Sequence, residues 1–123
     1  AQLRKLPGWT RRRQEIAAIY DEQLVGVTTP AVAPGAQHVY HQYTIRVTGD
    51  RDAFVAALAD RGVGSGVYYP VPVHRLPTFA EVLDLPTTEQ AAAQVISLPV
   101  HPALSDEDVA TVVAAVNSVA EGA

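Results

Sequence analysis

The sequence of 123 residues contains no cysteine and no methionine, and its only lysine is Lys5. Without cysteine, disulfide bonds and thiolate metal sites are excluded, as is usual for cytoplasmic proteins. No apolar run approaches the roughly 18 residues that cross a bilayer. We therefore expect a cytoplasmic protein with no membrane partner. Because methionine is absent, we also expect the start codon to lie elsewhere, with Ala1 a processed terminus or the edge of a longer chain.

Positive charge is also scarce, since the formal net charge is -4. The only basic cluster, residues 11–13, is followed closely by Glu15 and Asp21, which is typical of a solvated helix face. We therefore expect no nucleic-acid partner. Hydrophobic residues make up 48% of the chain, enough for one packed domain. Residues 1–123 are predicted to form that single domain.

The first half of the chain predicts two helices, each followed by a strand. Apolar residues recur at helical spacing from Pro7 to Leu24. Residues 39–47 alternate between apolar and polar, which predicts a strand with His41 on its apolar side. Asp50 is a suitable cap for a second helix that ends at residues 61–62. The glycine-rich, β-branched stretch from Val63 to Tyr69 predicts another strand.

The second half predicts a turn around residues 79–83, a helix over residues 87–94 and a strand over residues 95–100. The clearest element is the last, because Ser105 precedes three acidic residues and a stripe of valines at helical spacing. Strands separated by helices predict an α+β fold: a small antiparallel or mixed sheet of about three strands packed against helices.

The histidines do not predict a metal site. His38 and His41 form an H-x-x-H pattern, but on a strand this spacing directs the two side chains to opposite faces. The remaining histidines are His74 and His101, and neither has a cysteine beside it. We therefore expect no metal.

Serine and glycine motifs are equally weak. Neither Ser65 nor Ser97 lies in a G-x-S-x-G elbow, so a serine nucleophile is not supported. The glycines at positions 62, 64 and 66 follow a predicted helix and lead into a strand. A dinucleotide fingerprint has the opposite order. A flexible turn explains these glycines better, and no catalytic residue is predicted in this chain.

A proline-stiffened loop carries the remaining candidates for ligand binding. Two phenols, Tyr68 and Tyr69, precede Pro70 and Pro72, and the imidazole of His74 and the guanidinium of Arg75 follow. Such a loop offers stacking and hydrogen bonds to a hydroxylated or phosphorylated ligand at a small entropic cost. The alternative, a core tyrosine pair beside a structural loop, fits the same residues.

Five segments of the chain are informative when taken together. They are Ala17-x-x-Tyr20-x-x-x-Leu24 with the preceding Arg13, Val39-Tyr40-His41-Gln42-Tyr43, residues 51–62, the Tyr69-Pro70-x-Pro72-x-His74 loop, and Ser97-Leu98-Pro99-Val100-His101-Pro102 with Leu104-Ser105. In this order they resemble the C-terminal part of the DegT/DnrJ/EryC1/StrS family, which comprises sugar aminotransferases of fold type I that depend on pyridoxal phosphate (PLP). The resemblance covers nearly the whole chain.

The resemblance implies that residues 1–123 are the small C-terminal domain of a longer enzyme, whose large PLP-binding domain is absent from this chain. Lys5 is then not the catalytic lysine, and the chain alone is expected to be inactive and without cofactor. The complete enzyme, by resemblance a homodimer, would transfer an amino group from glutamate or glutamine to a nucleotide-linked keto sugar. Tyr68, Tyr69 and His74 are implied substrate-binding residues.

One departure from the family pattern concerns position 68. Many members have His-Tyr-Pro where this chain has Tyr68-Tyr69-Pro70, so a cationic or general-acid role is lost while hydrogen bonding remains. Dehydratases and enzymes that act on carbocycles also occur among the relatives. Two other classes stay open: a stand-alone α+β module that binds a small ligand without catalysis, and a structural module whose tyrosines pack against a partner.

Overall fold

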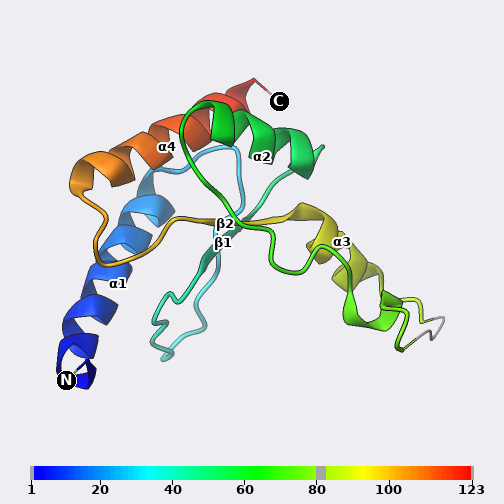
Figure 1. Ribbon diagram of the computed structural model, residues 1–123, viewed down its shortest axis with the longest axis horizontal. Helices are drawn as coiled ribbons and strands as arrows, with labels where there is room; N and C mark the ends of the chain where they lie inside the picture. Colours follow the sequence, from blue (N-terminus) through cyan, green and yellow to red (C-terminus); the bar gives the residue numbers. More distant parts are fainter. Residues whose placement is uncertain (1, 80–82, 123) are drawn as a thin grey trace.

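The computed structural model describes residues 2–79 and 83–122 (Figure 1). In this part of the chain, four α-helices accompany a two-stranded antiparallel sheet, which confirms the predicted α+β class. The helices are α1 (Leu6–Gln23), α2 (Arg51–Asp60), α3 (Pro86–Gln94) and α4 (Asp106–Glu121); the strands are β1 (Tyr43–Arg46) and β2 (Val95–Leu98); the one-turn 3-10 helices are η1 (Leu3–Lys5) and η2 (Val73–Arg75). None of the described helices is long and apolar enough to span a membrane. The turn predicted around residues 79–83 falls largely outside the described residues.

The sheet is narrower than predicted. Strand β1 pairs with β2 from Tyr43↔Leu98 to Arg46↔Val95. Single bridges extend the sheet at both edges, where Thr28 pairs with Arg46 and Gly66 pairs with Ser97. The strand predicted over residues 63–69 is therefore reduced to the bridge at Gly66. Among the described residues, the pairing with β2 does not continue past Gly66, and the prolines at positions 70 and 72 have no N–H that could extend it.

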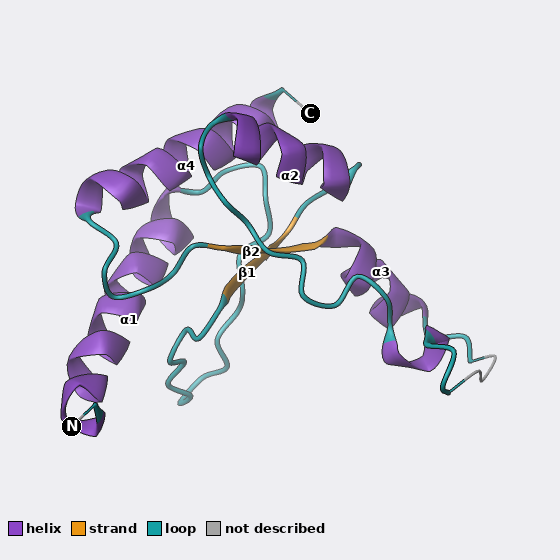
Figure 2. Cartoon of the chain, in the orientation of Figure 1, coloured by secondary structure: helices purple, strands orange, loops and turns teal. Residues whose placement is uncertain are grey.

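Helices α1, α2 and α4 pack over the sheet, whereas α3 projects away from them together with the loop that precedes it (Figure 2). The largest fully buried side chains are Tyr20, Tyr43, Ile16, Ile45, Leu58, Ile96, Val47, Val109 and Val116. Helix α4 begins as predicted, with a capping box between Ser105 and Asp108. Its buried valines form the predicted stripe. The core thus lies on one side of the molecule, and the loop with the candidate site lies on the other.

The segment before β1 differs from the prediction. Val39 is 55% exposed and His41 is exposed, while Tyr40 between them is buried. Tyr40 has a positive φ of 47°, a conformation that non-glycine residues seldom adopt, and its N–H donates to Nδ1 of His38 at 2.8 Å. This left-handed residue interrupts the alternation of side chains. The predicted placement of His41 on the apolar side was wrong for this reason.

Candidate functional site

The loop between residues 67 and 79 presents the two predicted tyrosines to solvent. Tyr68 is 60% exposed and Tyr69 is 76% exposed. The ring of Tyr68 lies back against Gly66, where an added Cβ would come within 2.9 Å of Cε2 of Tyr68. Gly66 pairs with Ser97 of β2, so this close approach places the ring beside the edge of the sheet. Both phenols can therefore donate and accept hydrogen bonds with a ligand outside this chain.

The third predicted residue, His74, is buried and faces α3. Its Nε2 lies 3.1 Å from Oε1 of Glu89, and Nε of Arg75 donates to the same oxygen at 3.0 Å. The hydrogen bonds from Arg75 first, and from His74 second, lower the pKa of Glu89 below its ordinary value. The structure thus holds His74 in an ion-pair cluster and separates its imidazole from solvent, whereas the tyrosines remain exposed.

Apolar side chains are concentrated around this cluster. Beside His74 is a hollow of about 380 Å³, whose lining is mainly apolar. The loop and the segment just before α3 also carry a dense run of exposed large hydrophobic residues: Tyr68, Tyr69, Val71, Val73, Leu76, Phe79, Leu83 and Leu85. Scattered apolar residues are normal on a surface, but such a concentration is typical of a surface that contacts another molecule or domain.

Glu89 was not among the residues predicted from the sequence. It lies 15 positions after His74, on a different element, and nothing in its local sequence connects it to the loop. Sequence reasoning did single out Arg75, which the structure places in the same cluster. Among the described residues, no group of three or more histidine, aspartate or glutamate side chains is arranged to hold a metal. The candidate site therefore offers binding groups and an ion-pair cluster.

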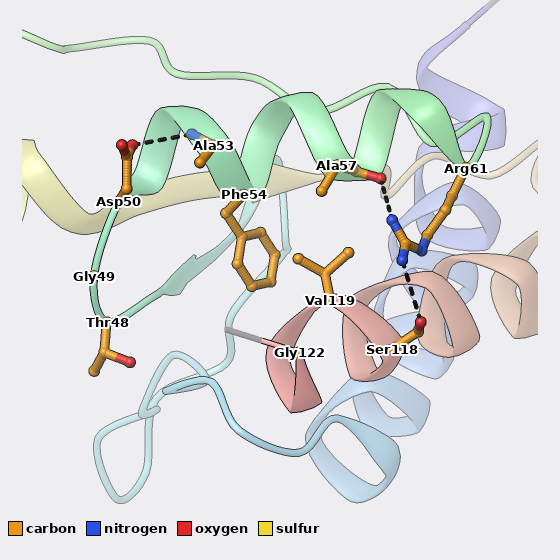
Figure 3. Close-up of a pocket in the computed structure, with 10 residues that line it drawn as sticks. All are labelled: Thr48, Gly49, Asp50, Ala53, Phe54, Ala57, Arg61, Ser118, Val119 and Gly122. Carbon is orange, nitrogen blue, oxygen red and sulfur yellow. Dashed lines mark hydrogen bonds between the residues drawn. The ribbon is translucent and has the colours of Figure 1, made fainter.

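A larger cavity of about 490 Å³ lies between α2 and the end of α4 (Figure 3). Phe54 and Val119 form its apolar wall. Its charged groups serve the helix termini: the carboxylate of Asp50 accepts from the N–H groups of the first turn of α2, and Arg61 donates to the carbonyl of Ala57 at 2.9 Å. None of the predicted site residues lies in this cavity. The loop carrying Tyr68 and Tyr69 remains the stronger candidate.

Comparison with known proteins gives one consistent result. A sequence profile described as the DegT/DnrJ/EryC1/StrS aminotransferase family matches residues 1–117. The chain is 42% identical over 111 residues to a pleiotropic regulatory protein of Geobacillus stearothermophilus, covering 83% of this chain and 30% of that protein. It is 39% identical over 109 residues to UDP-2-acetamido-2-deoxy-3-oxo-D-glucuronate aminotransferase of Pseudomonas aeruginosa, covering 86% of this chain and 30% of the enzyme.

A solved structure agrees with these matches. The crystal structure of S. venezuelae DesV in complex with a ketimine intermediate superposes with a TM-score of 0.91 at 36% identity, covering 97% of this chain and 34% of DesV. Nearly the whole fold thus occurs within a larger protein. The chain spans about a third of the length of the relatives that it matches.

Proposed function

The chain belongs to the DegT/DnrJ/EryC1/StrS aminotransferase family, and we propose that it forms the small C-terminal domain of a PLP-dependent enzyme that aminates a nucleotide-linked keto sugar. The observation that carries this proposal is the superposition on DesV, which extends over nearly the entire chain. The name of the Pseudomonas aeruginosa relative supports a keto sugar linked to a nucleotide as the substrate class. Glutamate or glutamine is the proposed amino donor.

The residues of this chain do not fit the cofactor. PLP is held in its enzymes through a Schiff base with a lysine, and the only lysine here is the exposed Lys5 on the single turn η1. We therefore assign the cofactor and the chemical steps to a large domain outside residues 1–123. The proposed contribution of this chain is to bind and orient the substrate.

Within this proposal, Tyr68, Tyr69 and His74 border the nucleotide-sugar site. The exposed phenols supply hydrogen bonds to sugar hydroxyls or diphosphate oxygens, and their rings supply an apolar wall. His74 takes part from the base of the loop, beside the apolar hollow. The run of exposed hydrophobic residues in this loop faces the large domain or the second subunit of a homodimer. A cytoplasmic location fits soluble nucleotide-sugar substrates.

The proposal is tested with the complete protein, the Tyr69→Phe variant and PLP. Glutamate or glutamine is offered together with UDP- or dTDP-linked keto sugars, and formation of 2-oxoglutarate or 2-oxoglutaramate, respectively, is followed. We expect turnover by the wild type and a KM for the sugar that rises several-fold in the variant. Because Tyr69 is 76% exposed, we expect removal of its phenol oxygen to leave thermal stability unchanged. Absence of transamination would refute the function, whereas identical kinetics would refute the role of Tyr69.

A further inference from the structure

The loop that carries Tyr68 and Tyr69 has little contact with the core. Among the described residues between Val63 and Ala92, His74 is the only one that is buried. The backbone hydrogen bonds of η2 are local, from the N–H of Arg75 to Pro72 at 2.9 Å and from the next residue to Val73 at 3.1 Å. These bonds shape a single turn, but they do not fix its position relative to the rest of the molecule.

A single carboxylate provides the hydrogen-bonded part of that connection, beside the apolar side chains that line the hollow. In the described part of the chain, the only hydrogen bonds that join residues 67–79 to another element end on Oε1 of Glu89. This oxygen accepts from Nε of Arg75 and from Nη2 of the same guanidinium, and it lies 3.1 Å from Nε2 of His74. Hydrogen bonds to a charged acceptor are stronger and more directional than those between neutral groups.

We propose that Glu89 is a positioning residue for nucleotide-sugar binding: it fixes η2 against α3 and thereby sets the place of Tyr68 and Tyr69. Prolines at positions 70 and 72 make the connection between the tyrosines and η2 stiff, so a displacement of η2 reaches the phenols. This inference rests on the proposed function and extends it to a residue that does not itself border the nucleotide-sugar site.

The test compares Glu89→Ala, Glu89→Gln and a control, Glu22→Ala, in the complete protein. Alanine and glutamine favour helix, so α3 is retained in both variants. Glu22 is an exposed glutamate on α1, distant in sequence from the loop. The first readout is amide hydrogen exchange in peptides covering residues 67–79. The second readout is kinetic: the KM for the keto sugar and the rate of the half-reaction with the amino donor alone are both measured for each variant and compared with the wild type.

We expect faster exchange in residues 67–79 of Glu89→Ala, unchanged exchange in α4, and a KM for the sugar raised roughly fivefold, as the loss of about one hydrogen bond implies. Glu89→Gln should show the same changes in smaller degree. The half-reaction with the amino donor and the Glu22→Ala control should match the wild type. Unchanged exchange, or faster exchange with an unchanged KM, would overturn the inference. If the wild type does not aminate nucleotide sugars but exchange in residues 67–79 is still faster in Glu89→Ala, the proposed function alone is refuted.

Discussion

Replacing Gly26 by alanine tests the packing between the end of α1 and α4. Gly26 has a φ of +71°, and an added Cβ would lie 2.8 Å from Cβ of Ala120. The turn is held in place on α4, because the N–H of Val25 donates to Oδ1 of Asn117 at 3.0 Å and Nδ2 of Asn117 donates to the carbonyl of Gln23 at 2.9 Å. The left-handed backbone costs a residue with a Cβ about 1–2 kcal/mol. Overpacking against α4 adds about 1–3 kcal/mol.

The matched control is Gly62→Ala. Gly62 has a similar φ of +77°, but nothing lies within 4 Å of its added Cβ, so only the backbone cost applies. Urea unfolding followed by circular dichroism should place Gly26→Ala about 2–5 kcal/mol below the wild type and about 1–3 kcal/mol below Gly62→Ala. An equal loss of unfolding free energy in the two variants would refute the close packing of Gly26 against Ala120 of α4.

Two further predictions concern the candidate site and the core. Gly66→Ala should push the ring of Tyr68 away from the sheet and change the KM for the nucleotide sugar. Thermal melting should show a loss of unfolding free energy below about 1 kcal/mol, because the group that the new Cβ meets is the exposed side chain of Tyr68. A larger loss of stability would contradict this expectation. Burial raises the pKa of the phenols of Tyr20 and Tyr43 above their ordinary value of 10.0, and hydrogen bonding to Asp21 adds to the effect at Tyr43. The folded state therefore retains protons that the unfolded chain loses, so the free energy of unfolding should be constant below about pH 10 and fall above it. Tyr43→Phe should flatten this fall, and an equal slope in both proteins would count against it.

Features set by neighbouring residues were predictable from the sequence. The final helix combines Ser105, the acidic first turn and the valine stripe, and the structure contains all three at the predicted positions. Asp50 likewise caps α2 through hydrogen bonds to the N–H groups of residues 52 and 53. In both helices the signal lies within one or two turns of the chain, so the sequence alone carries it.

Features set by distant contacts were not predictable. Tyr40 is held in its left-handed conformation beside His38, in a loop whose carbonyl at position 38 accepts from Gln14 of α1 at 2.9 Å. Tyrosine has no local preference for that conformation. Nothing in the sequence therefore indicated that the alternation of buried and exposed side chains is interrupted before β1. The partnership of His74 with Glu89 is similar, because it depends on how α3 folds back beside the loop.

The most direct test is a structure of the complete protein with its nucleotide-linked amino sugar bound. We expect a large PLP-binding domain outside residues 1–123, with the phenol oxygen of Tyr68 or Tyr69 at hydrogen-bonding distance, about 2.6–3.2 Å, from a sugar or diphosphate oxygen. We also expect Glu89 to keep its contacts to His74 and Arg75 in the complex. A ligand bound elsewhere, such as in the cavity between α2 and α4, with both phenols in solvent, would refute the proposed function of the loop.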